Sequence, residues 1–167
     1  NGPRKEGAVM IDRDYEQATD EHRKKGCRMK VYIAASLAMH GLAHRFRYDL
    51  QRLGNGACEV VSRWHEPETL EACKRIADMG ETGARAVAQL SFADLRRADV
   101  LLCLPDDECR GALVELGYAL GRGIGVVVAG RPPTLMACGE HAVVIETKHI
   151  EDLVAELRKT YESRGAK

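Results

Sequence analysis

The sequence predicts an α/β fold in which a five-stranded parallel sheet is covered by helices on both faces. Short apolar segments alternate five times with longer segments of helical pattern. The apolar segments are almost continuously hydrophobic, which is typical of strands buried on both faces of a sheet. Five such strands with helical crossovers favour the doubly wound, flavodoxin-like strand order 2-1-3-4-5.

Each element follows from a local pattern. Apolar, partly β-branched runs predict strands at 29–36, 58–62, 98–104, 124–129 and 141–145. Helical spacing of apolar residues predicts helices at 38–53, 111–120 and 150–162, and a long helical region at 67–97 that breaks at Gly80 and Gly83. In this strand order a ligand binds at the carboxyl ends of strands 1 and 3. Residues 34–36 and 105–110 are therefore expected at the crevice.

Length and charge narrow the class of protein. A chain of 167 residues is long enough for one domain with a normal core. Residues 1–28 are polar and charged and are interpreted as an arm or peripheral helix, while residues 29–167 are expected to form the single domain. The 25 Lys and Arg balance the 25 Asp and Glu, so neither polymeric nucleic acid nor a membrane surface is an expected partner.

Cysteine and histidine usage predicts neither a metal site nor a cofactor. None of the six cysteines forms a C-x-x-C pair, and several lie in apolar stretches. This usage is typical of reduced thiols in a cytoplasmic protein. His40 and His44 stand four residues apart and can share a helix face, but no third ligand accompanies them.

One acidic residue interrupts an apolar helix. The stretch R-G-A-L-V-E-L-G-Y-A-L-G-R-G (residues 110–123) is apolar almost all the way round, yet it carries Glu115 near its middle. A lone buried carboxylate costs several kcal/mol unless it is paired or hydrogen-bonded. Glu115 is therefore either a functional carboxylate or one that turns outward to Arg110 or Arg122. The glycines Gly111, Gly117 and Gly121 are expected to let another segment approach this helix closely.

Three stretches resemble a known enzyme family. They are K-V-Y-I-A-A-S (30–36), A-D-L-R-R-A-D-V-L-L (93–102) and P-D-D-E-C-R-G-A-L-V-E-L-G-Y-A-L-G (105–121). Together they resemble the nucleoside 2-deoxyribosyltransferase family, whose relatives include N-glycosidases that hydrolyse 2′-deoxynucleoside 5′-monophosphates. The resemblance extends over about residues 29–157. S-R-W-H-E (62–66) is similar to a segment of small phage and bacterial members.

The resemblance implies an active site. Glu115 matches the family's nucleophile, which attacks C1′ of the sugar and expels the base. Tyr32 matches the tyrosine that hydrogen-bonds this nucleophile. Asp106 lies in the loop whose residues contact the sugar hydroxyls, and Gly111 opens the nucleophile's helix motif. T-L-M (134–136) resembles a loop that lines a neighbouring subunit's site, so Met136 is a candidate substrate contact and a homo-oligomer, at least a dimer, is expected.

The match fails at two acidic positions. Ser91 stands where the family often has the Asp that serves as acid and base toward the leaving base, eight residues before Asp99. Asp94, one helical turn later, is either a partial substitute or a surface residue. Cys109 stands where the transferases have an Asp six residues before the nucleophile. Asp99 itself is expected to be structural.

A phosphate contact is a further expectation. The monophosphate hydrolases hold phosphate with small hydroxyl residues and helix N-termini, and Ser36 sits where strand 1 enters its helix. Arg45 and Arg47 lie further along and either assist or are solvated helix charges. Ser36, Ser91, Asp94, Asp106, Cys109 and Gly111 are thus the candidate substrate-binding residues, with Met136.

The expected function is cleavage of the N-glycosidic bond of a nucleoside or nucleotide, with transfer of the sugar to a second base or to water. Two alternatives use the same fold. A nucleotide-binding module that has lost the chemistry would explain Ser91 and Cys109. An NAD-cleaving enzyme of the TIR-like type also uses a Glu on a flavodoxin-like core, but the pattern around Glu115 argues against it.

Overall fold

The sheet has five parallel strands in the predicted order. The computed structural model describes residues 28–53, 57–78, 80–130, 142–145 and 149–165. The strands are β1 (Met29–Ala35), β2 (Cys58–Val60), β3 (Val100–Leu104), β4 (Gly125–Ala129) and β5 (Ala142–Ile145). They lie in the order β2-β1-β3-β4-β5, and every neighbouring pair is parallel. The predicted flavodoxin-like fold class is confirmed.

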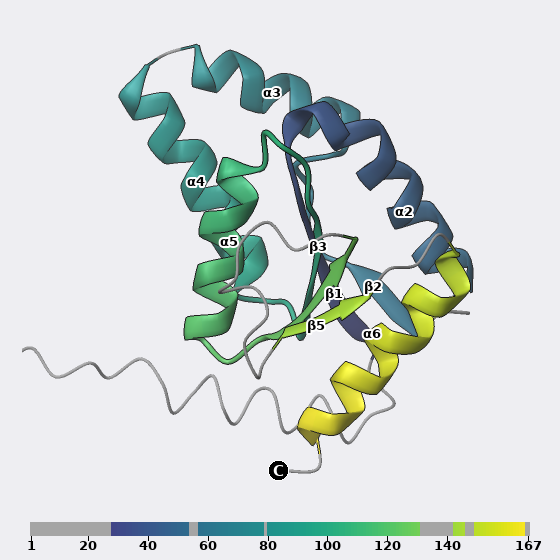
Figure 1. The fold of residues 1–167 in the computed structure, drawn as a ribbon. Coiled ribbons are helices and arrows are strands. Elements are labelled where there is room, and N and C mark those ends of the chain that lie inside the picture. Colours follow the sequence, from purple (N-terminus) through teal and green to yellow (C-terminus); the bar gives the residue numbers. More distant parts are fainter. Residues whose placement is uncertain (1–27, 54–56, 79, 131–141, 146–148, 166–167) are drawn as a thin grey trace, which may run out of the picture.

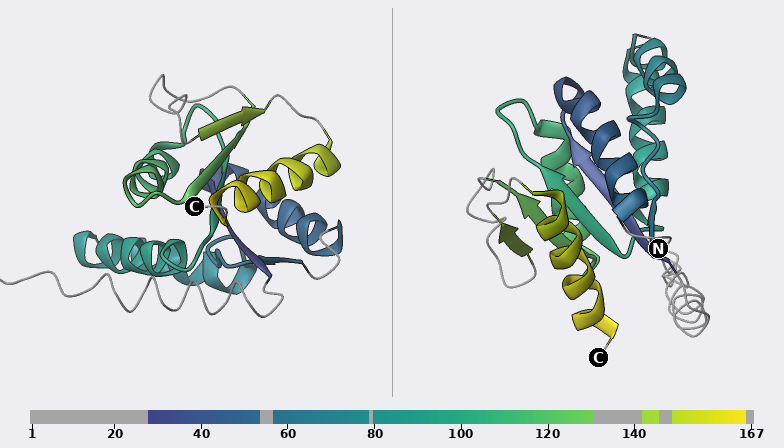
Figure 2. Two further views of the ribbon diagram at one scale, coloured as in Figure 1. Left: turned by 90° about the horizontal axis from the view of Figure 1, so that it is seen from below. Right: turned by 90° about the vertical axis from the view of Figure 1, so that its right-hand side faces the viewer.

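Helices cover both faces of this sheet. They are the short 3-10 helix η1 (Leu37–Met39), α2 (His40–Leu53), α3 (Pro67–Ala77), α4 (Glu81–Leu95), α5 (Arg110–Gly121) and α6 (Ile150–Gly165). In Figures 1 and 2, α4 and α5 lie on one face and α2 and α6 on the other. Each face encloses its own apolar cluster. One holds Tyr32 with Leu116 of α5, and the other holds Ile33 with Leu50 of α2 and Leu157 of α6.

The predicted helical region at 67–97 is two helices with one break. Gly80 adopts φ 76° just before α4, a conformation that a residue with a Cβ rarely takes. Gly83, which together with Gly80 was expected to mark the break, is buried inside α4. Among the described residues of this region, the break therefore lies at Gly80 and not at Gly83.

β2 ends earlier than the sequence predicts, and side chains complete the edge of β1. The backbone pairing of β1 with β2 stops at Val31 and Val60, and the Val61 amide still donates to the Val31 carbonyl at 2.9 Å. Beyond it, the Ile33 amide donates to Ser62 Oγ at 3.1 Å, and Trp64 Nε1 donates to the Ile33 carbonyl at 2.8 Å. The residues after β2 are thus fastened to β1 without being a strand.

Two sequence-based expectations concern residues outside the described ranges. The charged arm at 1–28 falls almost wholly there, as does the T-L-M segment with Met136. Within the described ranges no helix is long and apolar enough to cross a membrane. The carboxylate of Asp99 accepts the Lys30 amide at 2.8 Å, which ties the start of β3 to β1 as expected of a structural residue.

Candidate active site

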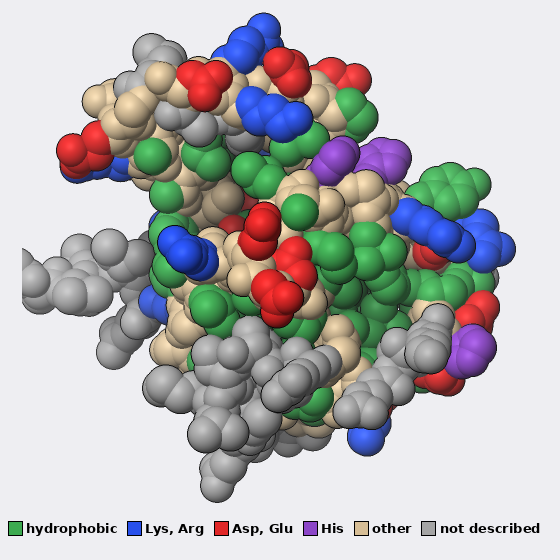
Figure 3. Space-filling model, turned by 45° about the horizontal axis from the view of Figure 1, so that its top comes forward, with side chains coloured by type: hydrophobic (Ala, Val, Ile, Leu, Met, Phe, Trp, Pro, Cys, Tyr) green, Lys and Arg blue, Asp and Glu red, His purple; other side chains and the backbone are tan. Residues whose placement is uncertain are grey.

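The carboxyl ends of β1 and β3 form the predicted crevice. The two strands run in register to Ala35 and Leu104, so the residues that follow them meet at one edge of the sheet. There the Ser36 hydroxyl donates to Asp106 Oδ2. The other oxygen, Asp106 Oδ1, accepts the Glu108 amide at 3.1 Å, which shapes the loop into α5. Figure 3 shows acidic side chains gathered on the face at this edge.

Glu115 is hydrogen-bonded to Tyr32. The Tyr32 hydroxyl donates to Glu115 Oε1 at 2.6 Å, although the two residues are 83 positions apart. Tyr32 is completely buried on β1, and Glu115 lies in the second turn of α5, which packs against that strand. The structure thus joins the two predicted catalytic residues. Glu115 turns inward to Tyr32, so the reading in which it turns outward to an arginine is wrong.

The Glu115 carboxyl group has a strongly raised pKa. Burial raises it from 4.5 to about 7, while hydrogen bonds from Tyr32 and Ser91 oppose the rise. The residue as a whole is partly exposed. Burial also raises the pKa of Tyr32 well above 10, which keeps its hydroxyl protonated as a donor. The carboxyl group therefore changes charge near neutral pH.

Ser91 brings a third element to this group. It lies in α4, close enough to Glu115 and Tyr32 for its side chain to lower the pKa of both. The position that departs from the family's pattern is therefore a neighbour of the candidate nucleophile. A serine hydroxyl can donate or accept a hydrogen bond, but it does not titrate in the range of a carboxylic acid.

Asp94 is buried and paired with an arginine. Only 4% of its surface is exposed, so the surface reading of this residue is wrong. Arg63 donates to it from Nε at 3.0 and 3.1 Å and from Nη2 at 2.8 Å, and the Arg63 amide adds a bond at 3.3 Å. These bonds hold the Asp94 carboxylate and the Arg63 side chain in one relative orientation.

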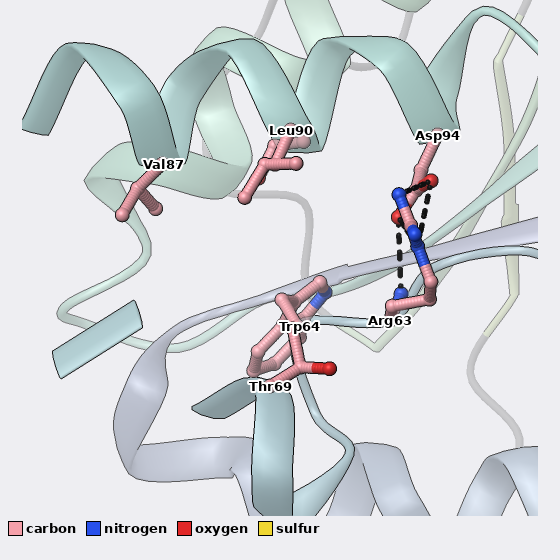
Figure 4. A pocket seen from close by; sticks show the side chains of 7 residues that line it. Arg63, Trp64, Thr69, Val87, Leu90 and Asp94 are labelled. Atoms are coloured by element: carbon pink, nitrogen blue, oxygen red, sulfur yellow. Dashed lines mark hydrogen bonds and ion pairs between the residues drawn. The ribbon is translucent and has the colours of Figure 1, made fainter. Parts of the chain in front are cut away.

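A pocket opens between α3 and α4 beside this ion pair. Its volume is about 80 Å³, and Figure 4 shows the side chains around it. It is lined by Arg63, Trp64, Thr69, Val87, Leu90, Ser91 and Asp94. Since Ser91 lies close enough to Glu115 to lower its pKa, the pocket adjoins the candidate nucleophile.

Two candidate positions at the start of α5 differ in access. Cys109 is only 4% exposed and packs in the apolar cluster, so a ligand reaches its thiol only if the covering side chains move. Gly111 is exposed. A Cβ at Gly111, Gly117 or Gly121 would have no described atom outside its own helix within 4 Å. The expected close approach to these glycines is therefore wrong for the described part of the chain.

The expected phosphate contacts do not converge. Arg47 pairs with Glu66, and Arg45 lies 3.7 Å from Asp49 on the exposed side of α2. Ser36 uses its hydroxyl to bond Asp106, which places a carboxylate where an anion was expected. This arrangement suits a hydroxyl group better than a phosphate, because like charges repel.

Arg63 and Trp64 are site residues that the sequence did not predict. Both belong to the S-R-W-H-E segment, for which the resemblance implies no role. An arginine beside a tryptophan just after a strand is the one local signal, but the partner of Arg63, Asp94, is 31 residues away. Only the packing of α4 over this segment brings the three together.

Thiols and metals play no visible part in the site. Among the described residues Cys58, Cys103 and Cys109 are free and buried, and burial raises the pKa of Cys103 to about 12. A buried thiol with such a pKa stays protonated and unreactive at neutral pH. In the same part of the chain no group of three or more His, Cys, Asp or Glu side chains is arranged to hold a metal ion.

Comparison with known proteins identifies no family for this chain. No protein-family model matches this sequence, and no curated protein matches it either. The structure is similar to the crystal structure of a conserved protein from Enterococcus faecalis V583, with a TM-score of 0.46 and 18% sequence identity. The match covers 80% of this chain and 99% of that one. Any function has to follow from the geometry of the site itself.

Proposed function

We propose that this protein cleaves the N-glycosidic bond of a nucleoside, with Glu115 as the nucleophile and Tyr32 as the residue that orients it. The observation that carries the proposal is the 2.6 Å hydrogen bond between Tyr32 and Glu115. It holds an otherwise costly carboxylate at the crevice of a doubly wound sheet, where ligands of this fold class bind. The resemblance to the nucleoside 2-deoxyribosyltransferases supports the same roles.

The chemistry needs a carboxylate beneath the sugar. An oxygen of ionised Glu115 bonds to C1′, the bond from C1′ to the base nitrogen breaks, and its electron pair leaves with the base. The base then takes a proton from water. In the second step water, or a ring N–H of another base, attacks C1′, releases Glu115 as a carboxylate and loses its proton to the solvent. Two displacements at C1′ retain its configuration.

The surroundings of Glu115 support this role. Burial strengthens the interaction of a carboxylate with the positive charge that develops on the sugar. The pKa of about 7 leaves a large ionised fraction at neutral pH. Its Oε1 is oriented by Tyr32, and the Ser91 hydroxyl assists.

The Ser36–Asp106 contact supports binding of the sugar through its hydroxyl groups. A carboxylate accepts a hydrogen bond from a sugar hydroxyl, and the serine hydroxyl can donate or accept one. The same pair disfavours a phosphate at this point. A nucleoside is therefore a better candidate substrate than a nucleoside 5′-monophosphate.

The test is release of free base, measured by chromatography. Deoxy- and ribonucleosides and their 5′-monophosphates are incubated with the protein, each with and without a second base. Glu115→Gln is expected to lower the rate by at least about 10³-fold, because the amide cannot act as a nucleophile. Glu108→Gln, an exposed acid just before α5, is the matched control and is expected to leave the rate unchanged.

Each result separates the candidate functions. New nucleosides that form only with a second base indicate a transferase, and base release without one indicates a hydrolase. Equal rates for the Glu115→Gln protein and the wild type contradict the proposal. Saturable nucleoside binding with no product from any substrate favours the alternative of a binding module without chemistry.

A further inference from the structure

The pocket beside Glu115 combines apolar walls with a charged end. In Figure 4, Val87 and Leu90 point from α4 toward Trp64 and Thr69, and the Arg63–Asp94 pair closes one end. The volume of about 80 Å³ is several times what one water molecule needs, which is about 10–15 Å³. A space with apolar sides and a polar end suits a flat ring that has hydrogen-bonding groups along one edge.

The guanidinium of Arg63 is fixed but still has donors to offer. Its bonds to Asp94 use Nε and Nη2. The Nη1 group makes no hydrogen bond within the described part of the chain, and 49% of the side chain is exposed. Asp94 is buried, so it holds the planar fork in one orientation. The pair thus presents the remaining N–H donors of Arg63 in a fixed orientation.

The backbone that carries Arg63 is also fixed. The residue before it, Ser62, accepts the Ile33 amide and contacts His65 Nε2 at 3.1 Å. The residue after it, Trp64, donates to the Ile33 carbonyl. Ser62 and His65 are fully buried. Arg63 is therefore positioned before any ligand arrives, which lowers the entropy lost on binding.

Ser91 connects this pocket to the reacting group. It lines the pocket, lies close enough to Glu115 to lower its pKa, and stands one helical turn before Asp94 on α4. A ring in the pocket lies along α4, with one end near Glu115 and the other at the ion pair. That is the placement which a base needs when its sugar is held at Glu115.

We propose that this pocket binds the base of the substrate, and that Arg63, held in place by Asp94, selects a pyrimidine. The inference rests on the function proposed above. Each pyrimidine base carries a carbonyl at C2, which can accept a hydrogen bond from the remaining donors of Arg63, whereas adenine has no carbonyl. A single ring is also closer in size than the two rings of a purine to a pocket of about 80 Å³ lined by Trp64 and the aliphatic side chains of α4.

Binding to the Glu115→Gln protein tests the inference without turnover. The dissociation constants of deoxyuridine, thymidine, deoxycytidine and deoxyadenosine are measured by calorimetry, each also as the 5′-monophosphate. Because the sugar is constant, the differences report the base. The pyrimidine compounds are expected to bind at least about tenfold more tightly than the adenine compounds.

Removing the charges of the ion pair should remove this preference. Arg63→Gln combined with Asp94→Asn, in the Glu115→Gln background, replaces both charges with amides of similar shape, so neither partner is left as an unpaired buried charge. Pyrimidine affinity is expected to fall at least about tenfold. Arg85→Gln on the exposed side of α4 is the control and should change nothing. If the double variant fails to fold, Arg63→Lys, which keeps the charge without the planar fork, is judged by the same criteria.

The outcomes separate this inference from the proposed function. Equal binding of purine and pyrimidine, binding of neither, or unchanged pyrimidine binding in the folded Arg63 variants overturns the inference. Base release that depends on Glu115 but shows no pyrimidine preference leaves the proposed function standing and overturns only the inference. Pyrimidine binding that depends on Arg63, without product from any substrate, supports the pocket and overturns the proposed function.

Discussion

Glu115 and Tyr32 form a coupled pair in which each residue sets the state of the other. Burial pushes the glutamate toward its neutral form, and the tyrosine hydroxyl favours the ionised form by donating to it. The carboxylate in turn helps to keep Tyr32 protonated. Such a pair can hold a reactive acid near its midpoint at neutral pH, where a nucleophile or a general base is most useful.

The pKa of about 7 predicts a pH dependence of activity. We expect kcat/KM for base release to rise between about pH 5 and 9, with a midpoint near 7, because the ionised form of Glu115 is the nucleophile. A profile that stays flat over this range, for a substrate that does not itself titrate there, would show that Glu115 does not limit the rate.

Tyr32→Phe should move this midpoint to higher pH. The hydrogen bond from Tyr32 lowers the pKa of Glu115, so its loss lets burial raise that pKa further. At pH 7 the rate is expected to fall by about tenfold or more, with part of the loss recovered above pH 8. Tyr118→Phe, one turn after Glu115 on α5, is the matched control. A midpoint that stays in place or moves down would contradict the coupling.

At the scale of elements, the break between α3 and α4 shapes the pocket. Gly80 turns the chain so that α4 packs back over the segment after β2, where Asp94 meets Arg63. The short β2 has a related effect, because Ser62 and Trp64 bond the free edge of β1 in place of a longer strand. Both features lie outside the regular helices and strands, at the break before α4 and in the segment that follows β2.

Two glycine substitutions distinguish a required glycine from a tolerated one. Gly80→Ala is expected to lower the free energy of unfolding by about 1 kcal/mol, because an L-residue is strained at φ 76°. Gly41→Ala, inside α2, is expected to raise it by about 0.5–1 kcal/mol, because alanine favours a helix. Neither added Cβ would have a described atom outside its own helix within 4 Å, so backbone conformation alone decides the sign. Urea unfolding of both variants measures the two effects, and equal signs would contradict this account.

At the scale of the whole molecule, the candidate site lowers the stability of the fold that assembles it. Tyr32 comes from β1, Ser91 from α4 and Glu115 from α5. The two helices pack on the face of the sheet where Tyr32 lies. A buried carboxyl group whose pKa is raised destabilises the folded state wherever the unfolded chain would ionise it. Residues retained at such a cost are typical of functional sites.

Glu115→Gln should therefore stabilise the protein in a pH-dependent way. Below pH 4.5 the Glu115 carboxyl group is protonated in both the folded and the unfolded state, so its raised pKa does not change the free energy of unfolding. Between 4.5 and about 7 the unfolded chain releases the proton while the folded protein keeps it, and stability falls. Above pH 7 the rise in pKa corresponds to a destabilisation of roughly 3 kcal/mol, which the substitution removes. Hydrogen bonds that the glutamine amide leaves unmade reduce this gain in stability. Tm measured at pH 8 is expected to increase in the variant, with a much smaller gain at pH 5.

The control for this experiment is Glu108→Gln, which removes an exposed carboxylate near the same helix. It is expected to leave Tm almost unchanged at both pH values. A Glu115→Gln protein that is less stable than the wild type at pH 8 would show that its hydrogen bonds to Tyr32 and Ser91 outweigh the cost of burial.

The fold and the central pair could be predicted from the sequence because their signals are local. Continuous apolar runs mark strands buried on both faces, and a lone acid in an apolar helix marks a site that needs a partner. The position of Glu115 near the crevice follows from the strand order. No local sequence pattern predicts the ion pair of Arg63 and Asp94, since each residue alone resembles an ordinary surface charge.

The sequence by itself determined the parallel sheet, its strand order and the identity of the acid at its crevice, because periodicity and burial act over a few neighbouring residues. Only the tertiary structure decided which side chains meet that acid. Tyr32 and Ser91 reach Glu115 from separate elements, and Arg63 reaches Asp94 across 31 residues. Such contacts depend on how α4 and α5 pack against β1, and packing is a property of the whole core that no short stretch contains.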